Sequence, residues 1–302
     1  MTQSPAGTYE NDILGNRTWL NRFTESTGKR YTWDAINRLA SACNTTNGAS
    51  YKYRADGMRI RKVEGLTLQW DVDDEETGSG HYDENQSTNK PTTRYFYDGQ
   101  MQHEVDYTYT ESNVIKKEIT RYGLGARGID FIEKVTTHPT TTTVKAFPLY
   151  DGHGNMAWTL QRSGTNSYTA NDGRVYGARG QIQSGNQTGD PKGRYVANFG
   201  HVQDDESGLT YMSARYYEPS TGKFINQDPA RDGVNWFVYA HSNPTNLIDF
   251  SGKLAGTFVA LLAGLLFSAA FVVGPVGWLC AWCHLLAARH SGVRMKEPYL
   301  AQ

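Results

Sequence analysis

Two aspartates, Asp228 and Asp249, are the residues whose type and spacing could do chemistry. Asp228 begins Asp-Pro-Ala-Arg (residues 228–231), and Asp249, 21 residues later, begins Asp-Phe-Ser-Gly (residues 249–252). Two carboxyl groups held close together cannot both ionise easily, so one can remain protonated as an acid while the other activates water. The alternative is that both aspartates accept backbone hydrogen bonds in turns, as Asp-Pro and Asp-x-x-Gly sequences often do. The residues alone leave both interpretations open.

No other group of side chains predicts a site. The 8 histidines are scattered, and Cys280-Ala-Trp-Cys283-His284 has the spacing of a haem attachment motif but lies within apolar sequence. A structural zinc site needs four ligands, which this pair of cysteines does not supply. We therefore expect no cofactor, no metal and no conventional enzyme, with self-cleavage by the aspartate pair as the most that the chain catalyses. The net charge of −1 argues against a nucleic-acid partner.

The aspartates lie in a stretch, residues 199–252, that is rich in aromatic residues and in turn dipeptides such as Ser207-Gly208 and Thr221-Gly222. Short apolar runs between such turns predict tight β-hairpins. Upstream, one pattern recurs: an aromatic pair, then Asp with Gly or Asn, then Arg or Leu. Its key tyrosines are Tyr31, Tyr53, Tyr97, Tyr122, Tyr150 and Tyr176. Each unit predicts a hairpin that buries its apolar face only when successive units stack into one sheet.

These patterns resemble the RHS/YD-repeat proteins and their C-terminal RHS-repeat-associated core domain. The matching words are Asp205-Glu206-Ser207-Gly208-Leu209, Ala214-Arg215-Tyr216-Tyr217, Gly222-Lys223-Phe224, Gln227-Asp228-Pro229, Tyr239-Ala240 and Asn243-Pro244. The resemblance implies an all-β fold, a spiral of stacked β-hairpins that forms a shell around a C-terminal cargo. Six repeat units are too few for a whole shell, so we expect a partial one. The expected divisions are a polar lead-in (1–30), YD-type repeats (31–198), the core motif (199–252) and a variable hydrophobic tail (253–302).

The resemblance also implies a role for the aspartates. In many RHS proteins the two aspartates of paired Asp-Pro-x-Gly motifs come together and cut the chain just after the second motif. Here that would be autoproteolysis by Asp228 and Asp249 after Gly252. The chain departs from the motifs at Arg231, which replaces Gly, and at Phe250, which replaces Pro. Arg231 could hold a carboxylate ionised, which would disfavour a shared proton.

The tail differs sharply from the rest of the chain. Residues 254–288 contain no Asp, Glu, Lys or Arg, and residues 254–273 alone match the roughly 20 apolar residues of a membrane span. Gly274-Pro275-Val276-Gly277 then predicts a break or kink. We expect a hydrophobic α-helical segment that associates with a membrane through residues 254–288. The alternative is a helix buried in the core or plugging the shell.

The sequence therefore predicts an RHS-repeat β-shell module of a polymorphic-toxin-like or cell-surface protein, which encapsulates or presents its own C-terminal tail as cargo. The alternative is a surface carbohydrate-binding or adhesion module, anchored by its hydrophobic segment, whose tyrosines would stack on surface glycans. Either function predicts a membrane-associated, cell-surface or extracellular location, although the polar N-terminus shows no ordinary signal peptide.

Overall fold

The computed structural model describes residues 2–4, 7–21, 28–44, 46–67, 89–231, 233–253 and 255–257. The chain divides into a unit at Met1–Gly256, which holds nearly all of the described residues, and a second unit at Thr257–Gln302. Apart from the short strand β22 (Ala255–Thr257), the predicted membrane segment at 254–288 lies outside the described residues, and so does the Cys-x-x-Cys-His sequence. Within the described part of the chain, no helix is long and apolar enough to cross a bilayer.

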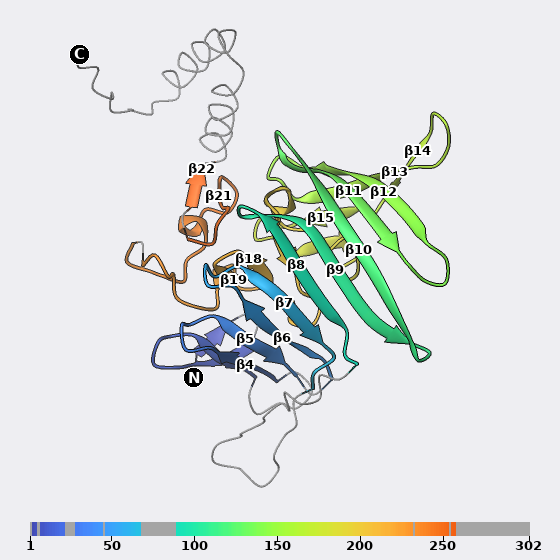
Figure 1. The fold of residues 1–302 in the computed structure, drawn as a ribbon. Coiled ribbons are helices and arrows are strands. Elements are labelled where there is room, and N and C mark those ends of the chain that lie inside the picture. The colour runs from blue at the N-terminus through green and yellow to red at the C-terminus, as the bar shows by residue number, and fades with distance from the viewer. Residues whose placement is uncertain are drawn as a thin grey trace, which may run out of the picture. The chain divides into compact units, whose positions relative to one another are not determined.

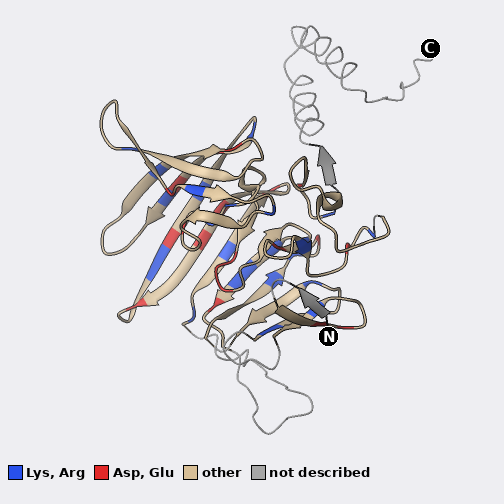
Figure 2. Ribbon diagram, turned by 180° about the vertical axis from the view of Figure 1, so that it is seen from behind, with Lys and Arg blue, Asp and Glu red and all other residues tan. Residues whose placement is uncertain are grey.

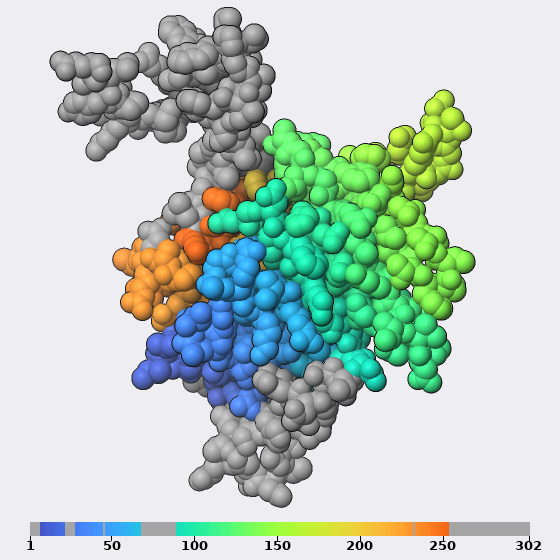
Figure 3. All heavy atoms as spheres, in the orientation of Figure 1, coloured from blue at the N-terminus to red at the C-terminus, as the bar shows by residue number. Residues whose placement is uncertain are grey.

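The expected all-β architecture is confirmed. Fourteen strands form one antiparallel sheet, in which each strand pairs with the next one along the chain (Figure 1). The strands are β1 (Thr2–Ser4), β2 (Gly7–Asn11), β3 (Arg17–Leu20), β4 (Lys29–Trp33), β5 (Leu39–Cys43), β6 (Gly48–Tyr53), β7 (Arg59–Glu64), β8 (Thr92–Asp98), β9 (Met101–Glu111), β10 (Val114–Gly125), β11 (Gly128–Thr136), β12 (Thr142–Tyr150), β13 (Met156–Arg162) and β14 (Tyr168–Asn171). In the space-filling view, these strands form a continuous surface (Figure 3).

The repeated pattern corresponds to a repeated hairpin. The six key tyrosines lie on β4, β6, β8, β10, β12 and β15 (Arg174–Tyr176). After β4, the Asp34 N–H donates to the Arg38 carbonyl, and the Asp34 carboxylate accepts the Arg38 N–H at 2.9 Å. The fourth turn residue, Asn37, has φ 69°, a conformation that Asn and Gly tolerate and that explains why they recur there.

The same turn occurs between β2 and β3, within the expected lead-in. The Asp12 N–H donates to the Asn16 carbonyl, the Asp12 carboxylate accepts the Asn16 N–H at 2.8 Å, and Gly15 has φ 81°. The aromatic pattern does not predict this unit, although Asp12-Ile-Leu-Gly15-Asn16 carries the turn residues of the repeat. Hairpins therefore begin earlier in the chain than Tyr31.

Cross-strand ion pairs add to the ladder of backbone hydrogen bonds. On β9 to β12, the Glu104, Arg121, Glu133 and Lys145 side chains form a row of alternating charge. Acidic and basic residues, red and blue in Figure 2, lie on neighbouring strands of this sheet. These pairs are partly exposed, and exposed ion pairs contribute little to stability, so they serve mainly to fix which residues face each other.

Smaller sheets follow the repeat sheet. The strands are β15 with β16 (Ile182–Gly185), then β17 (Val202–Gln203), β18 (Thr210–Met212), β19 (Arg215–Glu218) and β20 (Lys223–Phe224), and finally β21 (Leu247–Asp249) with β22. Two short 3-10 helices, η2 (Ala197–Phe199) and η3 (Ala240–Ser242), complete the set of described elements in this region. We call residues 199–252 the core motif.

The core motif packs against the repeat sheet. One apolar cluster joins Leu20, Tyr31, Leu39, Ala42, Ala49 and Tyr51 of the repeats to Leu209, Tyr211, Tyr216 and Ile225 of the core motif. Buried ion pairs also join them: Arg17 to Glu218 at 2.6 Å, and Arg59 to Asp204 at 2.6 Å. The first repeat hairpins thus bury their tyrosine faces against the core motif.

This packing bears on the glycan-binding alternative. That hypothesis needs tyrosine rings that are open to solvent and can stack on sugars. Tyr168 is 56% exposed, but the rings of Tyr51, Tyr95, Tyr211, Tyr216 and Tyr217 are all buried. The first four of these surround Arg59, whose guanidinium lies 4.6–6.0 Å from their ring centres. These tyrosines therefore stabilise the interior.

Candidate active site

The two predicted aspartates lie together. Asp228 follows β20, and Asp249 is the last residue of β21; both are buried, with 4% and 1% of their surfaces exposed. Their carboxylates share one partner, the Nη2 atom of Arg215 on β19, which lies 3.7 Å from Asp228 and 2.9 Å from Asp249. A guanidinium between two carboxylates offsets part of their mutual repulsion and so allows them to approach.

Both aspartates also hold turns, as the alternative interpretation expects. Asp228 accepts a hydrogen bond from the Ala230 N–H at 2.8 Å. Asp249 accepts from the Ser251 N–H at 3.3 Å and from the Lys253 N–H at 3.2 Å. In each carboxylate, Oδ1 accepts the backbone donors and Oδ2 faces Arg215. Each side chain therefore stabilises a turn and pairs with Arg215 at the same time.

Arg215 is the centre of the site. Besides the two carboxylates, its guanidinium donates to the Trp236 carbonyl at 2.9 Å and, through Nε, to the Gly252 carbonyl. Its charge lies 3.6 Å from the centre of the Phe224 ring. Burial lowers the pKa of Arg215, and the two aspartates oppose that shift. An arginine stays protonated in proteins, so a buried cation lies directly against the Gly252 carbonyl.

The backbone on the N-terminal side of the Gly252–Lys253 peptide is firmly held. Three successive carbonyls, those of residues 250–252, each accept a hydrogen bond. The donors are His201 Nε2 at 3.0 Å, the Ala214 N–H at 3.2 Å and Arg215 Nε. His201 is buried, and burial lowers its pKa, so the neutral imidazole is favoured.

Gly252 is required by this arrangement. Its φ is 69°, and a Cβ at this position would lie 2.2 Å from the Met212 carbonyl oxygen. A side chain would therefore push residue 252 away from Arg215. This explains physically why the second motif ends in glycine.

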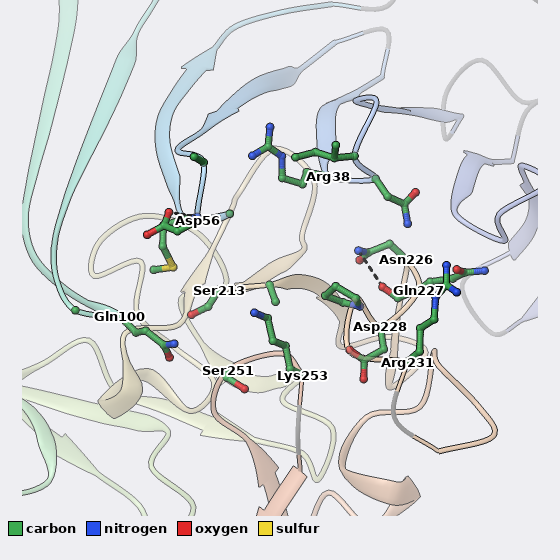
Figure 4. Close-up of a pocket in the computed structure, with 18 residues that line it drawn as sticks. Arg38, Asp56, Gln100, Ser213, Asn226, Gln227, Asp228, Arg231, Ser251 and Lys253 are labelled. Carbon is green, nitrogen blue, oxygen red and sulfur yellow. Dashed lines mark hydrogen bonds between the residues drawn. The ribbon is translucent and has the colours of Figure 1, made fainter.

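Two cavities flank the site. One, of about 400 Å³, lies between the core motif and the turns of the repeat hairpins, and Asp228, Ser251 and Lys253 line it together with Arg38 and Asp56 (Figure 4). The other, of about 370 Å³, is lined by Arg215 and by both aspartates. Asp228 thus lines both cavities, whereas Asp249 lines only the second.

The cation beside the carboxylates is not the one that the sequence suggested. The Arg231 guanidinium lies 5.7 Å from the Trp236 ring centre, whereas Arg215 pairs with both aspartates. Arg231 also has φ 52°, the left-handed conformation in which the related motif has glycine. One sequence feature could have identified Arg215: it is the single cation in the short aromatic run Ala214–Tyr217. An arginine buried in such a run needs a partner of opposite charge.

For metals, the described residues contain no group of three or more His, Cys, Asp or Glu side chains that could hold an ion.

Comparisons with known proteins show which proteins this chain resembles. No family model matches it. It is 28% identical over 250 residues, 80% of this chain and 9% of the relative, to the tRNA nuclease WapA of Bacillus subtilis (strain 168). It is 26% identical over 236 residues, 75% of this chain and 14% of the relative, to the probable deoxyribonuclease RhsB of Dickeya dadantii (strain 3937). Over 112 residues, 36% of this chain and 7% of the relative, it is 33% identical to the double-stranded DNA deaminase toxin A of Burkholderia cenocepacia (strain H111).

A solved structure of TcdB2-TccC3-TEV aligns with 81% of this chain and 17% of its own, at 16% identity and a TM-score of 0.39. The chain spans about a tenth of the length of the WapA relatives that it matches. A further match, to the probable deoxyribonuclease RhsA of Dickeya dadantii (strain 3937), covers 73% of this chain at 26% identity. The chain is RHS-related.

Proposed function

We propose that this chain is the RHS β-sheet module of a toxin-type protein, and that it cuts itself after Gly252. The segment from Lys253 onward would then be the cargo that the module presents. One observation carries the proposal: buried Arg215 and buried Asp249 contact the Gly252–Lys253 peptide, the bond at which self-cleavage is expected, and buried Asp228 lies 3.7 Å from the same arginine.

The geometry assigns a role to each group. Water entering the larger cavity meets Asp228, whose carboxylate accepts a proton as the water oxygen adds to the Gly252 carbonyl carbon. When the C–N bond breaks, the Lys253 nitrogen takes up a proton. That proton is the one that Asp228 accepted from water, and Asp249, whose carboxylate accepts the Lys253 N–H at 3.2 Å, orients the nitrogen and pairs with the ammonium group that forms.

Arg215 supplies electrostatic stabilisation. Negative charge develops on the Gly252 carbonyl oxygen in the tetrahedral intermediate, and Arg215 Nε already donates to that oxygen. A preorganised donor at such an oxygen, in a buried site, is typically the largest single contribution to catalysis of acyl transfer. The bonds to the carbonyls of residues 250 and 251 hold the peptide in register with these groups.

The comparisons support a module whose own role is not that of an effector. The relatives are named as a tRNA nuclease, a deoxyribonuclease and a DNA deaminase, and each is far longer than this chain. One similar segment shared by proteins with three different activities is better explained as the part that holds and releases an effector.

The test is the intact mass of the purified chain beside the Asp249→Asn variant. We expect the wild type to be split after Gly252 and the variant to be whole. Asp56→Asn is the matched control, because Asp56 lines the same cavity but pairs with Arg54 in an exposed turn, so this variant should still be split. A wild-type chain that stays at full length overturns the proposal, and the hydrophobic segment would then be better interpreted as a membrane anchor.

A further inference from the structure

The carbonyl oxygen and the amide nitrogen of the Gly252–Lys253 peptide each already contact a side chain of complementary charge. On the carbonyl side, the Gly252 oxygen accepts a hydrogen bond from Arg215 Nε. On the amide side, the Lys253 N–H donates to the Asp249 carboxylate at 3.2 Å. These are the two atoms that become charged if the bond is hydrolysed.

Hydrolysis converts these contacts into ion pairs. Water adds to the Gly252 carbonyl carbon, the C–N bond breaks, and the products at neutral pH are a Gly252 carboxylate and a Lys253 α-ammonium group. The carboxylate is formed against a guanidinium and the ammonium against a carboxylate. We propose that the cleaved site binds both new chain ends through Arg215 and Asp249, so that the cut chain stays assembled; this inference rests on the proposed function.

Burial makes these contacts effective. The Arg215 and Asp249 side chains are 3% and 2% exposed, so water competes little for either of them. Hydrogen bonds in which a partner is ionised are roughly twice as strong as neutral ones. Cleavage therefore strengthens the contacts that hold the two segments, although it removes the covalent bond between them.

The balance of charges in the site also favours retention of the tail. Before cleavage the site holds one guanidinium and two carboxylates, those of Asp228 and Asp249. Cleavage adds one negative and one positive charge, so the net charge does not change while both ends stay in place. If the tail departs with its ammonium group, three carboxylates remain around one buried guanidinium. The repulsion among them opposes departure of the tail.

The α-ammonium group also makes the retention dependent on pH. The charged and titratable groups that line the two cavities beside it are Arg38, Asp56, Arg215, Asp228, Arg231, His241, Asp249 and the Lys253 side chain. In peptides, carboxyl, imidazole and guanidinium groups titrate outside the range from about pH 7.5 to 10, whereas an α-amino group titrates within it. Raising the pH through that range should therefore remove the charge of the new chain end, and among the groups beside it only the Lys253 side-chain ammonium begins to lose its proton, at the upper end of the range.

The experiment uses the full chain with an N-terminal affinity tag, immobilised after self-cleavage and washed in mild detergent. The peptide 253–302 in the wash is quantified by mass spectrometry at pH 7.5 and at pH 10. We expect retention at pH 7.5 and release at least about ten-fold faster at pH 10, the effect of losing one hydrogen bond to a charged group. Circular dichroism at pH 10 establishes that the sheet remains folded.

The Lys253→Gln variant separates the two amines of residue 253. It keeps the new α-amino group and lacks the side-chain ammonium, so its release should respond to pH as the wild type does. Equal release rates at the two pH values, immediate release at pH 7.5, or loss of the response in this variant would each overturn the inference. An uncut chain, recognised by its intact mass, would instead overturn the proposed function and the inference with it.

Discussion

Asp204→Asn should be among the most destabilising single substitutions at the junction between the repeat sheet and the core motif. Asp204 Oδ2 lies 2.6 Å from Arg59 Nη1, and both side chains are 0% exposed. Asparagine has the same shape, so the change creates no cavity and leaves Arg59 charged among tyrosine rings. Removing one partner of a buried ion pair destabilises a protein by about 3–5 kcal/mol. Against a total stability of about 5–15 kcal/mol, this should greatly lower the urea midpoint.

Chemical unfolding followed by circular dichroism measures this effect. Asp56→Asn is the control, because the Arg54–Asp56 pair is exposed and its loss should cause no measurable change. The double substitution Arg59→Met with Asp204→Leu removes both charges of this pair, leaves Lys62 paired with Glu64 and Glu206, and should recover most of the lost stability. If Asp204→Asn unfolds within about 1 kcal/mol of the wild type, the buried pair does not hold the junction together and our reasoning is wrong.

Three further substitutions test other parts of the structure. Arg215→Lys keeps a cation but loses the Nε donor to Gly252, so self-cleavage, followed by intact mass, should slow by about 10²–10³-fold; an unchanged rate excludes the proposed role. Arg231→Gly should raise the free energy of unfolding by up to about 1 kcal/mol, because φ is 52° there, and a decrease would contradict this. Burial raises the pKa of Glu206 to about 7 from 4.5, so its stabilising contribution is present below pH 4.5 and is lost as the pH rises to 7. Glu206→Gln should therefore flatten the dependence of stability on pH across that range.

The hairpins could be predicted from sequence because their signals are local. An aspartate that caps a turn and a Gly or Asn that tolerates positive φ lie within five residues of each other, as in Asp34–Arg38. The unit at Asp12–Asn16 carries the same signals without the aromatic pair before them, and it was missed for that reason. Turn chemistry was thus a more reliable guide here than the aromatic spacing.

The packing of the core motif on the repeat sheet could not be predicted in the same way. Arg17 and Glu218 are 201 residues apart, and Arg59 and Asp204 are 145 apart. Nothing near either arginine in the sequence identifies its partner, because the partner is selected by how many hairpins stack between the two segments. Such pairings require the register of the whole sheet.

The site shows the same division between local and distant signals. Asp228 and Asp249 were named from their motifs, and the structure brings them together. Arg215, which pairs with both of them, lies on a different strand, β19. Only the fold shows that it faces both carboxylates. His201 likewise contacts Phe250 across 49 residues of sequence.

Self-cleavage should depend on folding of the repeat sheet, although every catalytic group lies in the core motif. The core motif buries Leu209, Tyr211 and Tyr216 in a cluster shared with the repeat strands, and β19 carries both Tyr216 and Arg215. Loosening the sheet therefore loosens the strand that aims Arg215 at Gly252. In a urea series, the Asp204→Asn chain should stop cleaving at a lower concentration than the wild type, in parallel with its unfolding. Continued cleavage by a chain whose sheet has unfolded would show that residues 199–252 assemble the site alone.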